Sequence, residues 1–346
     1  MKLGTFASGF GKQHSVNMDL VLLAEKLGYD SVWTAEAYGN DAVTTATWIL
    51  AQTKTIKVGT SIMQMPARTP AMTAMTAMSL DHLSGGRFIL GLGPSGPQVS
   101  EGWHGVPYGK PLTRTKEYIS IIRKILAREE PLTHKGTHYT IPITGEGTTG
   151  QGKALKSILH GNPLPIYTAS ISPNGLRCAA EVADGVFPVF MNPDSFDTVM
   201  APYFDEGFAK AGGGKGLDNF EICPSVSVIV TDDAEKARMP VKFQLALYIG
   251  GMGSRQKNFY NDYCKRLGYE DAAVEIQNLF LDGKKMEAAA AVPDALIDDV
   301  HLVGSEGFIR DRLSAWKEAG KSKQVGTMLI GTNQPEAIEL LAKEML

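Results

Sequence analysis

The amino-acid sequence predicts an α/β protein with the (β/α)8 TIM-barrel fold, in which a helical insertion precedes the last unit. Short apolar stretches alternate with helix-like stretches at close spacing, which is typical of repeated β/α units. The apolar stretches do not alternate with polar residues, as expected for parallel strands that are buried on both faces. We expect one domain over residues 1–346, with the insertion at about residues 239–291.

Eight apolar stretches are candidates for the strands of the barrel. They cover residues 3–6, 31–34, 56–63, 88–92, 165–170, 185–190, 220–231 and 325–330. The first stretch ends in Ala7-Ser8-Gly9, and the third and fourth run into loops rich in Gly, Pro and Ser. Because the carboxyl ends of parallel strands meet at one end of a barrel, we expect these loops to build the ligand site.

Helices are predicted between the strands from capping residues and apolar stripes. Asp41 is a good cap for a helix that runs to Gln52, and Ser172 followed by Pro173 is a good start for another. Asp232 or Asp233 is expected to cap the helix after the seventh strand. Further helices are expected at residues 17–27, 70–83, 113–126, 193–212, 305–319 and 335–346, with a hairpin at 134–141 and loops at 94–112 and 144–153.

The composition restricts the class of protein. Hydrophobic residues make up 43% of the chain, which is enough for a large core, and the net charge is only −3. This charge favours neither nucleic acid nor an anionic membrane as a partner. The chain has no apolar run of 18 residues and no apolar region of a signal peptide, so we expect no membrane span and a cytoplasmic location. The three Cys residues are far apart, which suggests a reducing compartment and no disulfide framework.

The most distinctive motifs lie between residues 59 and 105. They are Gly59-Thr60-Ser61-Ile62, the run Ser79-Leu80-Asp81-His82-Leu83-Ser84-Gly85-Gly86-Arg87, and Gly91-Leu92-Gly93 followed by Ser95-Gly96-Pro97-Gln98. By these motifs the chain resembles the bacterial luciferase-like family of TIM-barrel oxidoreductases over roughly residues 2–331. The Ser-Gly-Pro-Gln loop is similar to the branch that uses the deazaflavin coenzyme F420 instead of FMN.

The resemblance implies a cofactor site at the ends of the strands. It implies a non-prolyl cis peptide bond between Ser61 and Ile62, behind the ring of the deazaflavin. F420 carries a phosphodiester and an oligoglutamate tail, and the helix N-terminus after Ser172 offers N–H groups to an anion. An ordinary buried strand and an ordinary capped helix are the alternative interpretations of these two segments. The residues that we expect at the cofactor are Ser61, Ile62, Met63, Gln64, Ser95, Gln98, Ser170, Ile171 and Gly175.

Four residues are candidates for proton transfer or substrate contact, namely Glu36, Tyr38, Glu101 and His104. Glu36 follows the second strand, where the resembled family carries an acid followed by His, but Ala37 takes the position of that His. Pro94 likewise stands where sugar-phosphate dehydrogenases of the family carry an acidic residue. Both departures argue against a sugar-phosphate substrate. His104 beside Trp103 is also consistent with a simple surface pair.

Other side chains have structural interpretations. Arg68 is expected to be a solvated loop charge, with contact to an anion as the alternative. Met72, Met75 and Met78 recur at every third residue, which favours packing in the core. No group of His, Cys, Asp and Glu residues has the spacing of metal ligands, so no metal site is predicted.

The resemblance therefore implies an F420-dependent dehydrogenase or reductase. Such an enzyme transfers a hydride between the deazaflavin ring and a small organic substrate, and the family implies a homodimer. Alcohols, imines, pterin derivatives and activated alkenes are all candidate substrates. An FMN-dependent luciferase-like monooxygenase is one alternative, and a non-catalytic barrel that binds a flavin or deazaflavin is an alternative of another class.

Overall fold

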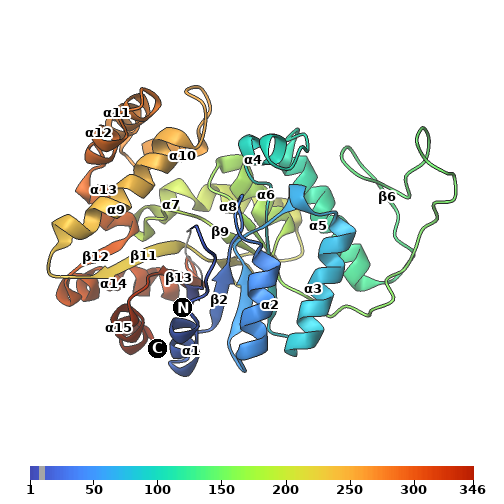
Figure 1. Ribbon diagram of the computed structural model, residues 1–346, viewed down its shortest axis with the longest axis horizontal. Helices are drawn as coiled ribbons and strands as arrows, with labels where there is room; N and C mark the ends of the chain where they lie inside the picture. Colours follow the sequence, from blue (N-terminus) through green and yellow to red (C-terminus); the bar gives the residue numbers. More distant parts are fainter. Residues whose placement is uncertain (8–11) are drawn as a thin grey trace.

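The computed structural model describes residues 1–7 and 12–346. Ser8 and Gly9, which the sequence predicts at the end of the first strand, lie outside the described residues. In Figure 1 the strands occupy the middle of the molecule and helices surround them, as a barrel of β/α units requires.

Parallel strands form the central sheet. In spatial order they are β10 (Glu221–Ile222), β9 (Gly185–Phe187), β8 (Ile166–Ala169), β5 (Phe88–Gly93), β3 (Lys57–Thr60), β2 (Ser31–Thr34), β1 (Lys2–Phe6), β13 (Thr327–Gly331), β11 (Ser225–Val230) and β12 (Leu302–Gly304), while β4 (Met63–Gln64) pairs with β5. In the register of this sheet, Gly4 of β1 lies beside both Ser31 and Leu329. All of these pairings are parallel, so the strands end on the same side.

The sheet closes into a barrel through the segment that contains β10 and β11. β10 pairs with β9, and β11 pairs with β13, so one continuous segment joins the two ends of the sheet. Between the two halves, Cys223 N–H donates to the carbonyl of Val186, and Leu329 N–H donates to the carbonyl of Pro224. The predicted seventh strand is therefore split at Pro224, which has no N–H to donate to a sheet.

The helices are α1 (Met18–Lys26), α2 (Ala42–Gln52), η1 (Met65–Ala67), α3 (Pro70–Ser84), α4 (Pro97–Gly102), α5 (Pro111–Ala127), α6 (Pro173–Val182), η2 (Pro193–Ser195), α7 (Phe196–Val199), α8 (Ala201–Ala211), α9 (Ala234–Ala246), the π-helical turn η3 (Leu247–Gly251), α10 (Phe259–Arg266), α11 (Glu270–Leu281), α12 (Lys285–Ala290), α13 (Asp294–Val300), α14 (Glu306–Lys321) and α15 (Pro335–Met345). Most helices surround the strands, while α10, α11 and α12 form a group at the upper left of Figure 1 and α4 lies at the top.

The predicted helix caps are present. The side chain of Asp41 accepts a hydrogen bond from Thr44 N–H at 2.6 Å, and Ser172 accepts one from Gly175 N–H at 3.2 Å. Of the two candidates for the cap of α9, it is Asp233 that accepts from the N–H of Lys236. These contacts satisfy N–H groups that the first turn of a helix leaves without a partner.

The structure also differs from the predicted elements at the site loop, at the insertion and before α14. The region predicted as a loop at residues 94–112 contains the short helix α4 and the first residues of α5. Helices between β11 and β12 extend from residue 234 to residue 300, beyond both ends of the predicted insertion. The strand β12 was not predicted, and it forms because the fully buried residues Leu302 and Val303 pair with β11.

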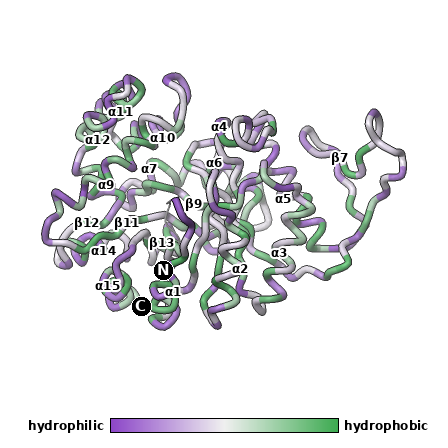
Figure 2. Tube along the Cα trace, in the orientation of Figure 1, coloured by the Kyte–Doolittle hydropathy of each residue, from purple (hydrophilic) through white to green (hydrophobic). Residues whose placement is uncertain are grey.

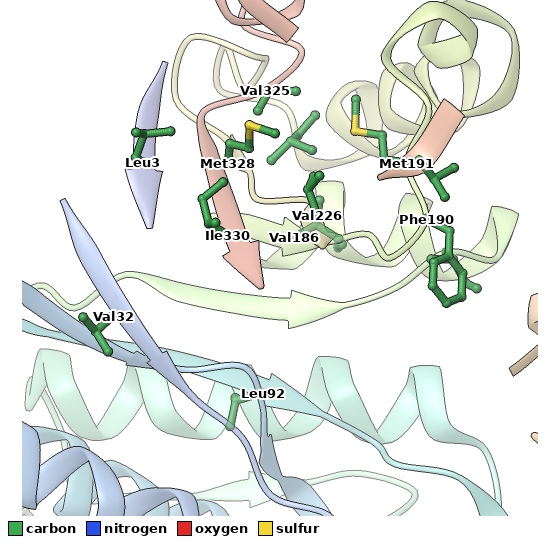
Figure 3. Packing of buried hydrophobic residues seen from close by; sticks show 14 of the residues in the cluster. Leu3, Val32, Leu92, Val186, Phe190, Met191, Val226, Val325, Met328 and Ile330 are labelled. Atoms are coloured by element: carbon green, nitrogen blue, oxygen red, sulfur yellow. The ribbon is translucent and has the colours of Figure 1, made fainter. Parts of the chain in front are cut away.

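Two hydrophobic clusters hold the fold together. The larger one fills the layer between strands and helices, and Figure 3 shows Val186, Val226 and Ile330 within it, on neighbouring strands. The smaller one, inside the barrel, consists of Trp33, Ile89, Tyr167, Phe187, Cys223 and Leu329. A Cβ atom on Gly59 would lie 2.2 Å from the Trp33 ring, so only glycine at this position leaves room for the indole.

One long segment extends away from the barrel. Residues 128–165 connect α5 to β8, and they carry the antiparallel hairpin of β6 (His134–Lys135) and β7 (Thr140–Ile141), as predicted. Figure 1 shows this segment at the right of the view, and Figure 2 shows hydrophobic and hydrophilic stretches alternating along it. Within the described residues, no helix combines the length and the apolar character needed to cross a membrane.

Candidate functional site

Glu36 lies just after β2 and holds the ends of several elements together. Its carboxylate accepts hydrogen bonds from the backbone N–H of Gln64 at 2.7 Å and of Ala42 at 3.0 Å. Arg68 donates to both carboxylate oxygens, at 2.6 and 3.2 Å. The Glu36 side chain is only 7% exposed. Its carboxylate therefore bonds to groups of the protein and is largely shielded from solvent.

Arg68 is not the solvated charge that the sequence predicts. It also forms an ion pair with Asp41, the cap of α2, and its own side chain is 18% exposed. Burial lowers the pKa of Arg68, but hydrogen bonding and attraction from Glu36 outweigh burial and raise the pKa above its ordinary value. The prediction was wrong because η1 turns the chain back, and the guanidinium then lies against the end of β2.

Gln64 connects Glu36 to His104. The Gln64 side-chain nitrogen lies 3.0 Å from the carbonyl oxygen of Glu36 and 2.8 Å from that of Ala37. Its side-chain oxygen lies 2.8 Å from Nε2 of His104, which follows α4. Gln64 is only 2% exposed, and both ends of its amide already have partners within the protein.

Aromatic residues lie beside this chain of contacts. The rings of Tyr38 and Trp103 are 6.4 Å apart, and both side chains are more than 60% exposed. From the helices after β11, Tyr248 and Tyr260 pack edge to face at 4.8 Å. Burial, followed by electrostatic interaction with Tyr38, raises the pKa of Tyr248. The helices after β11 and the loop after β2 therefore approach the same region.

Glu101 does not join the group around His104. It is exposed on α4, and its carboxylate accepts a hydrogen bond from the N–H of Tyr108 at 3.0 Å. Tyr108 in turn contributes to the electrostatic environment of Tyr260. Through this hydrogen bond Glu101 contacts the loop that follows α4.

Ser61 and Ile62 lie between β3 and β4, and the bond between them is cis, as predicted. Ile62 is half-buried and packs on the cluster inside the barrel, together with Phe6 and Ala169. A Cβ atom on Gly93 would lie 2.5 Å from the Ile62 side chain, so the two residues are in close contact. These half-buried residues form an apolar floor at the carboxyl ends of the strands. Met63 is fully buried, so it exposes no surface to a ligand.

A second group of predicted residues surrounds the N-terminus of α6. A Cβ atom on Gly175 would lie 2.9 Å from the side-chain oxygens of both Ser170 and Ser172. Glycine therefore allows two hydroxyl groups and the first turn of the helix to face one point, which suits an anion. Ile171 is buried, and its carbonyl oxygen accepts a hydrogen bond from Nη2 of Arg266 at 2.8 Å.

The loop after β5 carries the two remaining predicted cofactor residues. Ser95 is half-buried and has a positive φ of 60°. Gln98 is exposed in the first turn of α4, whose N-terminal residue is Pro97. The structure thus leaves the polar groups of this loop at the same end of the barrel as Ile62.

The sequence did not predict three contacts of the candidate site. Arg68 neutralises Glu36, the amide of Gln64 binds His104, and Arg266 reaches the start of α6 from α10. Each contact joins residues between 32 and 95 positions apart, so no local pattern reveals it. A possible signal was the position of Gln64 and Arg68 directly after the third strand, where barrel sites are built.

The fold and these sites define a parallel (β/α)8 barrel with an apolar floor, a polar cluster and an anion-compatible helix end at the carboxyl ends of its strands. A family model described as luciferase-like monooxygenase matches residues 1–323. The chain belongs to the luciferase-like monooxygenase family, which confirms the predicted resemblance.

Individual relatives and a solved structure are similar to nearly the whole chain. The chain is 46% identical over 330 residues to a putative coenzyme F420-dependent oxidoreductase of Mycobacterium tuberculosis, covering 94% of this chain and 95% of the relative. It is 30% identical over 332 residues to the 5,10-methylenetetrahydromethanopterin reductase of Archaeoglobus fulgidus, covering 94% and 93%. The solved structure of the coenzyme F420 dependent tetrahydromethanopterin reductase from Methanopyrus kandleri has a TM-score of 0.76 and 25% identity, and covers 99% of this chain and 97% of that one.

Proposed function

We propose that the protein is an F420-dependent oxidoreductase that transfers a hydride between the deazaflavin ring and a small organic substrate. The similarity to F420-dependent relatives over nearly the whole chain supports this function. When bound, the cofactor supplies the hydride chemistry. The residues of this chain bind and orient the cofactor and substrate, exclude water and move a proton.

The observation that carries the proposal is the group around the N-terminus of α6. Ser170, Ser172 and Gly175 form a space that a Cβ atom would fill, and the helix end attracts negative charge. Arg266 adds a cation at the same place, and no carboxylate of the described residues lies within ion-pair distance of it. A phosphodiester with an anionic tail fits this environment.

The apolar floor is the proposed support for the cofactor ring. Ile62 is part of this floor, and Ser61 precedes it across the cis bond. Ser95 and Gln98 are proposed to contact the ring or the phosphate from the loop after β5. Met63 and Gln64 support this floor from within the protein, because both are buried. Tyr38, Trp103 and His104 are the proposed substrate contacts, and Glu36 is proposed to position Gln64.

Binding of the purified protein to oxidised F420 and, in parallel, to FMN tests this function. We expect tight binding of F420 and weak binding of FMN. A preference for FMN would instead support a luciferase-like monooxygenase. Turnover separates an enzyme from a non-catalytic barrel: reduced F420 should be oxidised in the presence of a carbonyl, an imine, a pterin derivative or an activated alkene. Binding without any turnover would support the non-catalytic alternative.

We also propose that the protein is a cytoplasmic homodimer. Trp48 of α2 and Met72 and Met75 of α3 are more than half exposed. The sequence predicts core packing for Met72, Met75 and Met78, but of these three only Met78 is buried. Large apolar side chains grouped on two neighbouring helices support a protein interface at α2 and α3. The three cysteines are buried and free, which supports a reducing compartment.

A further inference from the structure

The side-chain amide of Gln64 has only one orientation that satisfies its surroundings. One end of the amide lies within 3.0 Å of two backbone carbonyl oxygens, those of Glu36 and Ala37. A carbonyl oxygen only accepts hydrogen bonds, so the end that faces it has to be the NH₂ group. The reverse orientation would replace two hydrogen bonds with two contacts between oxygens.

The orientation of Gln64 determines which nitrogen of His104 carries the proton. The remaining group of the amide is an oxygen, and it lies 2.8 Å from Nε2 of His104. An amide oxygen carries no hydrogen, so Nε2–H of His104 is the donor. In the neutral imidazole, Nδ1 then holds a lone pair. Nδ1 makes no hydrogen bond to any of residues 1–7 and 12–346.

The contacts behind Gln64 keep this arrangement in place. Its backbone N–H donates to Glu36 at 2.7 Å, and Glu36 is held by the guanidinium of Arg68. Gln64 is almost completely buried, so water does not compete for its amide. His104 thus hydrogen-bonds a rigid group through Nε2, while Nδ1 has no bond to the described protein.

We infer that Gln64 is a positioning residue that holds His104 as the Nε2–H tautomer and so makes Nδ1 the atom that exchanges a proton with the substrate. This inference rests on the proposed function. Protonated His104 gives its Nδ1 proton to the nitrogen or oxygen of a C=N or C=O group, and the ring returns to the neutral Nε2–H form. A bound reduced deazaflavin would supply the hydride for the adjacent carbon, so that the substrate would gain two electrons and two hydrogens in all. Solvent then restores the proton on Nδ1.

Nitrogen NMR of the histidine rings tests the inference without cofactor or substrate. In protein labelled with ¹⁵N at its seven histidines, a His104→Asn variant identifies the signals of His104. In the neutral form of His104, we expect Nε2 to be protonated and Nδ1 to be unprotonated. A wild-type spectrum with the proton on Nδ1 would overturn the inference, whatever the cofactor proves to be.

A Gln64→Leu variant tests the role of the amide. We expect the two nitrogen shifts of His104 to move toward each other, because both tautomers become populated. The matched control is Gln277→Leu, which replaces another buried glutamine on α11 and should leave the His104 spectrum unchanged. An unchanged Nε2–H tautomer in Gln64→Leu would show that Gln64 does not select it.

Kinetic measurements distinguish a role of Gln64 in positioning His104 from a role in stabilising the fold. General acid–base catalysis contributes factors of about 10²–10⁴, so Gln64→Leu should lower kcat by about tenfold or more. The affinity for F420 should fall less than kcat does, because the buried amide of Gln64 supports the proposed cofactor floor only from within the protein. A loss of F420 affinity with unchanged kcat would contradict the assignment. If Gln64→Leu does not fold, the wild-type spectrum still decides the tautomer.

Discussion

The guanidinium of Arg68 and the carboxylate of Glu36 form a two-point ion pair, with Nη1 2.6 Å from Oε1 and Nη2 3.2 Å from Oε2. This pair stands where the sequence suggests a free catalytic acid after the second strand. It joins η1 to the end of β2, and through Glu36 it fixes the backbone of Gln64 at 2.7 Å. The polar cluster at the carboxyl ends of the strands therefore depends on a buried charge pair.

Replacement of Arg68 by Met should destabilise the protein strongly. The change leaves the carboxylate of Glu36 buried without its counter-charge, and the breaking of such a pair costs about 3–5 kcal/mol. Urea denaturation measures the free energy of unfolding. Lys321→Met is the control, because the Lys321–Glu318 pair is solvent-exposed and should contribute about 0–1 kcal/mol. A loss as small as that of the control would contradict the role of the Glu36–Arg68 pair.

Replacement of Gly175 by Asp should weaken F420 binding by about tenfold or more. The new Cβ atom would lie 2.9 Å from the hydroxyl oxygens of Ser170 and Ser172, and the carboxylate would repel a phosphate, where about 1.4 kcal/mol corresponds to a factor of ten. A fluorescence titration with F420 measures the Kd.

Gly307→Asp is the matched control for Gly175→Asp. Gly307 also lies in the first turn of a serine-capped helix, but a Cβ atom there would lie 3.9 Å from its nearest neighbour, the hydroxyl oxygen of Ser305. This variant should bind F420 as the wild type does. Equal Kd values for both variants would place the phosphate elsewhere.

Replacement of Arg266 by Gln should weaken F420 binding and reduce its dependence on salt. Arg266 donates to the carbonyl of Ile171 at 2.8 Å, and a hydrogen bond to a charged group contributes about 1.5–3 kcal/mol when the anion is present. Titrations with F420 at low and high salt measure both effects. Lys265→Gln removes the same charge one residue earlier on α10 and should have a smaller effect. Identical Kd values for both variants would argue against a direct contact by Arg266.

The stability of the protein should fall as the pH drops from 6.5 toward 4. Burial lowers the pKa of His301 to about 4, so the unfolded chain binds a proton there at a higher pH than the folded chain does. Protons that bind preferentially to the unfolded state reduce stability as pH falls, here by about 3 kcal/mol in all. Urea denaturation at pH 7 and pH 5 measures the first part of this loss.

A His301→Gln variant should lose much of this pH dependence, because it removes the buried imidazole that accepts a hydrogen bond from the N–H of Ser227 at 3.0 Å. His82→Gln is the control, since His82 is exposed on α3 and should leave the pH dependence unchanged. If His301→Gln keeps the full pH dependence, other groups cause it.

Replacement of Met75 by Glu should shift the proposed homodimer toward monomer. A charge at the centre of an apolar interface has to be desolvated, which disfavours association. Light scattering after size-exclusion chromatography measures the mass. Val274→Glu on α11 places the same charge on another exposed apolar residue and should leave the mass unchanged. A monomeric wild type would refute the dimer itself.

Local sequence patterns determined much of the fold. Apolar runs without alternation marked β2 and β5, and the caps Asp41 and Ser172 marked the starts of α2 and α6, since each depends on residues close together in the chain. The resemblance of Gly59-Thr60-Ser61-Ile62 to a known family anticipated the cis bond that the structure contains. The helix α4 and the strand β12 were not predicted, because short elements leave little periodicity to detect.

The roles of the polar side chains were decided only by tertiary structure. Closure of the barrel brings the ends of β2 and β4 together, and this places Arg68 on Glu36 and directs the Gln64 amide to His104. The same closure buries Met63 and leaves Met72 and Met75 exposed, although all three are equally apolar in the sequence. Residue types indicate which groups can carry a charge or a proton. Whether such a group is free or already paired depends on contacts between distant segments, and these exist only once the strands have assembled into the barrel.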